Sequence, residues 1–338
     1  MNLQNIFCFL LVLFAQLSLV LSEPFTIAAI SLAVAASSSG AYYFRCKFQE
    51  CCNDDYVPYN INALQDSLKS NLFGQPLAME VIHILQGHKK SLTREGQKKA
   101  LSISMNGWPG TGKNYVSEFI AKSLFKNGMQ SKYVKLYIGR NHFPNKNRVE
   151  EYKKTLQEEV RALVKSCDRA LIIIDEVHDI PAGVLDVLKP FMDYHEKVDG
   201  VSYGNVIFLF LSNVNGNEIA KHLLKLNKDR DALVLADFDQ VLSKGSYRSE
   251  GGFRESEIVY SQLIDHYIPF LPLEQHHVEK CVQAEFSNVG KHFPKKEEID
   301  AVMAIISYGP SEMPVFANSG CKRIRNQVSY MNQKFSRS

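Results

Sequence analysis

The stretch that most restricts how this chain can fold is the loop "GWPGTGKN", Gly107–Asn114, together with its flanks. The apolar run "ALSISMNG" at 100–107 leads into the loop and predicts a short buried strand. The following "YVSEFIAKSLF" places apolar residues at helical spacing. A strand, a glycine-rich loop and a helix in this order predict a phosphate-binding loop within an α/β protein.

The composition of the loop suits a phosphate ligand. Its glycines let backbone N–H groups approach an anion, and the helix that follows adds the positive end of its dipole. Lys113 would reach the β- and γ-phosphates of a nucleotide. We expect the nucleotide to contact every residue of the loop: Gly107, Trp108, Pro109, Gly110, Thr111, Gly112, Lys113 and Asn114.

The last position of the loop departs from the usual pattern. Asn114 stands where a Ser or Thr hydroxyl normally holds Mg²⁺. Its amide oxygen can still coordinate Mg²⁺ or a bound water, but it is bulkier than a hydroxyl and its placement is less well defined. Asn114 is therefore a candidate metal ligand.

Two more apolar runs end in polar side chains. "LIIIDE" puts Asp175 and Glu176 at the carboxyl end of a buried strand, where the ligands of parallel sheets collect. Asp175 would hold Mg²⁺ directly or through water, and Glu176 would orient and deprotonate the attacking water. "FLFLSN" ends at Asn213, which could bind the γ-phosphate or that water, although a plain strand-ending turn is the alternative. With the loop, these residues predict hydrolysis of a nucleoside triphosphate.

Apolar and helical patterns alternate along the middle of the chain. Strands are predicted at 132–139, 170–176 and 205–213, with helices at 149–165 and 183–197. Continuous aliphatic strands separated by helices are typical of a parallel sheet that helices cover on both faces.

The pattern changes towards the C-terminus. The polar, glycine-rich stretch 243–256 predicts an exposed loop, and two prolines in "IPFLPLE", Ile268–Glu274, mark the entry to a helix-rich tail. We therefore assign a large α/β domain to 61–265 and a small helical domain to 266–338. A chain of 338 residues has room for both.

The N-terminal region contains two apolar runs. Residues 1–22 have the apolar core and the small residues before Glu23 of a signal peptide, although no positive charge leads it; a signal anchor is the alternative. Residues 23–45 are long enough to span a bilayer but only weakly apolar, so a hairpin or interfacial segment competes with a crossing. We expect the chain to enter the secretory pathway and to contact a membrane.

The cysteines agree with an oxidising compartment. Cys8 would leave with the signal peptide, and six cysteines would remain. Cys46, Cys51 and Cys52, within a linker at 46–60, could suggest zinc, but no second pair of ligands follows at finger spacing. Disulfides are favoured, and their connectivity is open.

Together these motifs resemble those of the torsins, which are lumenal AAA+ ATPases. The resemblance covers nearly the whole chain. It implies an AAA+ fold, a parallel sheet between helices with a small helical lid domain. Pro109 and the lack of glycosylation sequons depart from the family's pattern. The resemblance rests on "GWPGTGKN" with its unusual Asn, "IIIDE", "KPFMDYHEKVDGVSY", "FLFLSN", "YIPFLPLE" and "SGCK".

The resemblance also implies roles for individual residues. Asn213 would be sensor 1 and Lys322 would be sensor 2. Lys322 provides a point charge where Arg is usual. With Glu176, these two residues are the predicted catalytic residues. Cys321 would pair with Cys281 in a disulfide that links the nucleotide state to lumenal redox poise. A purely structural disulfide, or two buried thiols, is the alternative.

Torsins lack an arginine finger of their own. The resemblance therefore implies a partner that supplies one, a type II membrane protein whose lumenal domain mimics an AAA+ fold, and a supplied arginine raises hydrolysis by about 10³- to 10⁵-fold. We predict tight binding of ATP with Mg²⁺ and slow unaided hydrolysis. Arg230, Arg248 and Arg254 follow sensor 1, and action of one of them on a neighbouring subunit is the alternative.

The predicted function is an ATPase that remodels proteins or membranes in the endoplasmic reticulum lumen and perinuclear space. It would lie peripherally or monotopically on the lumenal membrane face, as a homo-oligomer or mixed ring. A net charge of +3 provides no basic face, so no nucleic-acid partner is expected. The alternative is a nucleotide-gated binding module, which has no need of a water-activating carboxylate such as Glu176.

Overall fold

The computed structural model describes residues 44–92, 99–309 and 314–336. The chain divides into two units, Met1–Cys51 and Cys52–Ser338. The predicted signal peptide at 1–22 and nearly all of the predicted membrane-associating segment at 23–45 lie outside the described residues. Of the helices in the described ranges, none combines the length and the apolar composition that a bilayer crossing requires.

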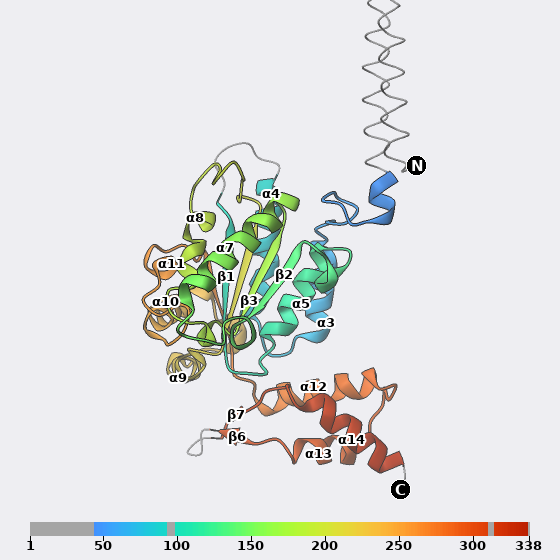
Figure 1. The fold of residues 1–338 in the computed structure, drawn as a ribbon. Coiled ribbons are helices and arrows are strands. Elements are labelled where there is room, and N and C mark those ends of the chain that lie inside the picture. The colour runs from blue at the N-terminus through green and yellow to red at the C-terminus, as the bar shows by residue number, and fades with distance from the viewer. Residues whose placement is uncertain (1–43, 93–98, 310–313, 337–338) are drawn as a thin grey trace, which may run out of the picture. The chain divides into compact units, whose positions relative to one another are not determined.

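The second unit is built on a five-stranded sheet in the order β2-β3-β4-β1-β5 (Figure 1). Every pairing in it is parallel, so the carboxyl ends of the strands meet at one edge. This confirms the predicted parallel sheet. The strands are β1 (Leu101–Gly107), β2 (Val134–Ile138), β3 (Leu171–Asp175), β4 (Ile207–Ser212) and β5 (His266–Phe270).

Each face of the sheet has its own apolar core, because successive side chains on a strand point to opposite faces. Ile173 and Leu209 belong to one core and their neighbours Ile172 and Phe208 to the other. Helices therefore enclose the sheet on both sides, as the aliphatic strands predicted. The first face is covered by α3 (Ile61–Asn71), α4 (Glu80–Leu92) and α5 (Lys113–Leu124), and the second by α7 (Val149–Ser166), α8 (Lys189–Met192) and α11 (Glu257–Tyr260). The remaining helices of this region are α6 (Gly139–His142), α9 (Gly216–Leu226) and α10 (Asp239–Arg248).

The predicted helix at 183–197 is wrong in its second half. A 3₁₀ helix at Leu185–Leu188 leads into α8, which ends at Met192. Beyond it, Val198 and Val201 pair across a tight turn in which Asp199 and Gly200 have positive φ. The helix ends because Asp193 has extended backbone angles, φ −89° and ψ 172°, and positive φ at Asp199 and Gly200, after the predicted range, suits a hairpin turn.

The predicted exposed loop at 243–256 is also wrong. Its first part belongs to α10, and Phe253 is only 2% exposed within the second core. Gly251, with φ +97°, lies so close to His178 that a Cβ there would be 2.4 Å from the His178 Cα. Here the glycine allows two backbone segments to pack closely together. Composition alone predicts a flexible loop from the same glycine.

The predicted domain boundary at residue 266 falls too early. β5 pairs with Ile103–Gly107 of β1 and belongs to the sheet. β5 is an edge strand, a position that tolerates Pro269 and its missing N–H. The small helical lid begins after Phe270 and has an apolar core of its own. Its elements are α12 (Gln275–Asn288), α13 (Lys296–Met303), β6 (Tyr308–Gly309), β7 (Phe316–Ala317) and α14 (Ile324–Ser336).

One arginine fastens the hinge between the sheet and the lid. The Arg230 side chain is 13% exposed and donates from Nε to the Gly74 carbonyl at 2.9 Å and from Nη2 to the Pro272 carbonyl at 2.8 Å. Its Nη1 donates to the Glu274 carboxylate at 2.9 Å. Pro272 and Glu274 lie in the linker between β5 and α12. Every nitrogen of the Arg230 guanidinium therefore donates a hydrogen bond within the chain.

The six cysteines that follow the predicted signal peptide form three disulfides. This confirms disulfides over zinc, and it confirms the pairing that the torsin resemblance implied for the lid. The pairs are Cys46–Cys51, Cys52–Cys167 and Cys281–Cys321.

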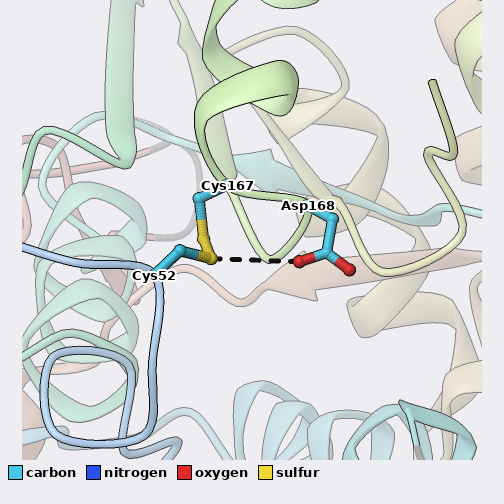
Figure 2. Close-up of side chains that lie close together, drawn as sticks. All are labelled: Cys52, Cys167 and Asp168. Atoms are coloured by element: carbon cyan, nitrogen blue, oxygen red, sulfur yellow. Dashed lines mark hydrogen bonds between the residues drawn. A yellow bond between two sulfur atoms is a disulfide. The ribbon is translucent and has the colours of Figure 1, made fainter. Parts of the chain in front are cut away.

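The Cys52–Cys167 bond ties the start of the second unit to the end of α7, across 115 residues of sequence (Figure 2). Asp168 lies beside it, with Oδ1 3.9 Å from the Cys52 Sγ. A disulfide sulfur has no proton to donate, so this contact is only close packing, and the Asp168 carboxylate instead accepts from the Asn205 amide at 2.7 Å. Since both sulfurs are used in the covalent bond, these side chains do not form a metal site.

We predict that the hinge makes stability depend on pH through His277, which is 5% exposed. Burial lowers its pKa to about 3, and the charges of Arg230, His276 and Lys280 act in the same direction. The folded protein therefore keeps His277 neutral, whereas an unfolded histidine takes up a proton below about pH 6.5. Stability should be full above that pH and fall by up to about 1.4 kcal/mol per unit on acidification.

Urea unfolding of the wild type and of a His277 variant at about pH 7 and about pH 5 measures this dependence. The comparison isolates His277, because the other titrating groups contribute equally to the stability of both proteins. His277→Gln should reduce the acid-induced loss of stability. His276→Gln, at the neighbouring position with 60% side-chain exposure, is the matched control and should keep most of the loss, because burial is the largest cause of the lowered His277 pKa and the charge of His276 a smaller one. An identical loss in wild type and His277→Gln would contradict the assignment.

Candidate functional site

The predicted phosphate loop joins β1, which lies between β4 and β5 in the sheet, to α5. Gly110 and Gly112 have φ of +79° and +108°, a region that side chains disfavour, and α5 begins directly after Gly112. Gly107 packs against the end of β5, where a Cβ would be 2.4 Å from the Phe270 carbonyl oxygen. The N-terminal turn of α5 thus presents backbone N–H groups and the positive end of its dipole, which favours an anion.

A cavity of about 790 Å³ lies where this loop, the carboxyl ends of β3 and β4, and the lid meet. Sites for small molecules are typically about 300–1,000 Å³. The structure brings nearly all the predicted site residues together here; only Gly107 and Trp108 do not line the cavity. The predicted residues that line it are Pro109, Gly110, Thr111, Gly112, Lys113, Asn114, Asp175, Glu176, Asn213, Cys281, Cys321 and Lys322.

Lys113 lies buried within the loop, with 4% exposure. Its Nζ donates to the carbonyls of Gly107 at 2.6 Å and Trp108 at 2.9 Å. Burial lowers the pKa of Lys113 to about 7; Asp175 opposes this shift and Lys322 adds to it. An anion in the cavity would favour the protonated ammonium, so the charge on Lys113 is matched to a phosphate ligand.

Asn114 contacts the predicted metal ligand directly. Its Nδ2 donates to Asp175 Oδ2 at 2.5 Å, while Asp175 Oδ1 accepts from the Glu176 N–H at 2.8 Å. A carboxylate and an amide so close together supply the oxygen donors that Mg²⁺ prefers. The residues present therefore fit Mg²⁺, and the amide also fixes the orientation of Asp175.

Glu176 and Asn213 follow adjacent strands of the sheet and line the same cavity. Glu176 has φ +54°, and its carbonyl packs against Gly139, where a Cβ would be 2.3 Å from the oxygen. A non-glycine residue in this left-handed region stores strain, which is common at active sites. A carboxylate and an amide at neighbouring strand ends can together position and deprotonate a water.

The lid reaches the phosphate loop through direct backbone contacts. The Cys321 N–H donates to the Gly110 carbonyl at 3.0 Å. Gly320, with φ +48°, packs so closely that a Cβ would be 2.3 Å from the same oxygen, and a Cβ on Gly110 would be 2.0 Å from the Ser319 oxygen. Cys321 also forms a disulfide with Cys281 of α12. The same residue therefore connects the lid disulfide to the phosphate loop.

Sequence reasoning missed Gln75, a buried amide that connects the loop to the segment just after β5. Its Nε2 donates to the Thr111 carbonyl at 3.1 Å and the Leu271 carbonyl at 2.7 Å, and its Oε1 accepts from the Leu271 N–H at 2.8 Å. A glutamine in a short loop carries no local sequence signal of such a role, and only its 3% exposure identifies it. The preceding Leu72 and Phe73 line the cavity and were missed for the same reason.

Sequence comparison finds relatives along most of the chain. The family model described as Torsin matches residues 46–174, and the one described as Torsin-1A, C-terminal domain, matches 273–331. A Torsin-like protein of Drosophila melanogaster is 38% identical over 319 residues, which cover 91% of this chain and 92% of the relative. A Torsin-like protein of Caenorhabditis elegans is 35% identical over 299 residues, which cover 86% and 83%.

Solved structures share the fold at much lower identity. A closed-state cryo-EM reconstruction of Hsp104 with ATPγS and FITC casein matches with a TM-score of 0.55 and 14% identity, over 82% of this chain and 48% of that chain. The S. cerevisiae Hsp104–ADP complex matches with a TM-score of 0.54 and 14% identity, over 82% and 47%. This chain thus spans about half of each Hsp104 chain. The likeness concerns the fold alone, and it confirms the predicted AAA+ architecture.

We predict that Gly320→Ala weakens nucleotide binding by at least about tenfold, equivalent to about 1.4 kcal/mol. The added Cβ forces Gly320 and Gly110 apart and opens the cavity on the lid side. Gly200→Ala is the matched control, because Gly200 also has positive φ, +78°, but no atom within 4 Å of its Cβ position. Titration with a fluorescent ATP analogue measures both variants, and equal affinities would show that the contact does not support binding.

Proposed function

This chain belongs to the torsin family, and from that premise we propose that it binds ATP with Mg²⁺ in the cavity between sheet and lid and hydrolyses it there. One observation carries the proposal. A single cavity is lined by the loop lysine Lys113, the strand-end residues Asp175, Glu176 and Asn213, and the lid lysine Lys322. These are the charges and hydrogen-bonding groups that phosphoryl transfer requires.

The phosphates would lie against the loop and the N-terminus of α5. Lys113 would exchange its two carbonyl partners for phosphate oxygens, and Lys322 would add a second positive charge from the lid. Asn114 and Asp175 would hold Mg²⁺, which when bound neutralises charge on the phosphates.

Glu176 would be the general base. Its backbone is fixed by the hydrogen bond to Asp175 and by the packing of its carbonyl on Gly139, so the carboxylate starts from a defined position. Asn213, at the end of the adjacent strand, would orient the attacking water as sensor 1. Orientation of water and removal of its proton are the two contributions that the chain itself would make to bond formation.

An activator would supply the missing arginine. Arg325 lines the cavity, but it lies on the lid with its Nε 3.8 Å from the Glu285 carboxylate, and Arg230 is engaged at the hinge. We therefore keep a type II membrane protein with a lumenal AAA+-like domain as the proposed partner. The exposed Arg248 and Arg254 support the alternative, in which a second copy in a homo-oligomer or mixed ring acts in its place.

The three disulfides support a location in an oxidising compartment. We propose the lumen of the endoplasmic reticulum and the perinuclear space, at the membrane surface, where the protein would remodel proteins or membranes as a chaperone. The contact between Gly110 and Cys321 favours a second candidate, a nucleotide-gated binding module, because it lets nucleotide move the lid without hydrolysis.

Turnover of ATP by the purified protein tests the proposal. We expect slow hydrolysis by the wild type alone and a rise of about 10³- to 10⁵-fold with a lumenal activator domain. Glu176→Gln should bind ATP but show no activation, and Lys113→Ala should bind ATP poorly. Equal slow turnover in all samples would contradict an activated ATPase. Partner recruitment that persists in Glu176→Gln would instead favour the binding module.

Asn114→Thr tests the unusual last position of the loop. We expect unaided turnover to rise by about tenfold, because a hydroxyl is smaller than the amide and places the metal ligand better. Single-turnover rates with Mg²⁺ measure the effect, and the activated rate provides the comparison. If the affinity for Mg²⁺ with ATP and both rates stay unchanged, Asn114 merely substitutes for the hydroxyl, and the slowness originates in the missing arginine.

A further inference from the structure

Trp108 is the only tryptophan of the chain, and it does not line the cavity although it belongs to the phosphate loop. Its side chain instead contacts α9, the helix that follows Asn213. The indole Nε1 donates to the Asn217 Oδ1 at 2.9 Å. The loop is thus bonded to the element that begins just after sensor 1.

The packing of the indole on α9 leaves no space for another side chain. A Cβ at Gly216 would be 2.1 Å from the Trp108 Cδ1 and 2.9 Å from Nε1. The backbone at Gly216 does not have positive φ, so its conformation suits any residue. Trp108 therefore requires glycine at this position, mainly through its indole and also through its backbone nitrogen, which would be 3.0 Å from the Cβ.

The same indole also contacts the lid. The ring centroids of Trp108 and Phe316 are 6.2 Å apart in an edge-to-face arrangement. Phe316 is 2% exposed, lies in β7 and pairs with Glu274, which Arg230 binds at the hinge. One side chain therefore contacts both the helix after sensor 1 and the lid.

The main chain of Trp108 is held by the groups that would bind phosphate. Its carbonyl accepts from Lys113 Nζ at 2.9 Å and from the Thr111 hydroxyl at 2.8 Å. If Lys113 turns to a phosphate, this carbonyl loses its charged partner. The hydrogen bonding of the Trp108 main chain then changes, while its indole remains hydrogen-bonded to α9 and packed on the lid.

We propose that Trp108 is a positioning residue which couples phosphate binding at Lys113 to α9 and to the lid. This inference rests on the proposed function, because it requires a nucleotide at the loop. The indole bond to α9 and its packing on Phe316 hold the loop in the geometry that a phosphate would meet. Because coupling between sites is reciprocal, loosening this attachment should weaken nucleotide binding, although neither Asn217 nor Gly216 lines the cavity.

The test uses the full chain with Trp108→Phe, Asn217→Ala and the double variant. Trp108→Phe keeps an aromatic ring but lacks the N–H, and Asn217 is exposed, so its truncation leaves the core packing intact. Calorimetric titration with ADP and with ATPγS should give affinities reduced by about 3- to 10-fold in each single variant, the loss expected for one hydrogen bond. The double variant should lose no more than either single one.

The emission of the single tryptophan gives a second measurement. Nucleotide should shift the Trp108 emission in the wild type, and Asn217→Ala and Gly216→Ala should reduce that shift. Gly87→Ala on α4 is the matched control, since no atom lies within 4 Å of its Cβ position, and it should behave as the wild type.

The outcomes separate the inference from the proposed function. Failure of the wild type to bind either nucleotide would overturn both. Normal binding by the wild type with unchanged affinity in Trp108→Phe and Asn217→Ala, or with losses that add in the double variant, would overturn the coupling alone. A purely structural role predicts a lower melting temperature with unchanged affinity and emission shift, and that result would also overturn it.

Discussion

The site depends on the backbone contact between the phosphate loop and the lid. Two glycines, Gly110 and Gly320, face each other at a distance that no side chain would permit, and the Cys321 N–H closes the contact with a hydrogen bond. The cavity exists because the lid is held there against the carboxyl edge of the sheet. Arg230 fixes the lid at its other end, so two separate attachments define its orientation and place Lys322 opposite the ends of β3 and β4.

Local patterns predicted the parts of the site that adjacent residues determine. The spacing of apolar residues and the positions of polar residues at strand ends predicted the loop, the pair Asp175 and Glu176, and Asn213. The structure places them around one cavity. Long-range contacts were beyond such patterns. Gln75 and Arg230 act on residues far away in sequence, the glycines of 243–256 serve packing where composition indicated exposure, and β5 carries a proline that only its edge position explains.

The structure shows a contact of the unusual Asn114 that the motif alone did not predict. Its amide spans the distance to the Asp175 carboxylate and bonds to it, so the two candidate metal ligands form one connected pair. Such an arrangement is preorganised for binding, because the orientation of the carboxylate is set before a ligand arrives. The same bond restrains both groups.

The disulfide between Cys52 and Cys167 has a mechanical consequence. A pull on the chain from its N-terminal side passes through the covalent bond directly to Cys167, which lies between α7 and β3, so residues 53–166 carry none of that tension. The phosphate loop and the helix that starts from it lie within this bypassed stretch. Further along the chain, the Cys281–Cys321 bond shields most of the lid in the same way. Force applied along the backbone would therefore reach β3, β4, β5 and the hinge at Arg230, while the nucleotide-facing loop stays unloaded.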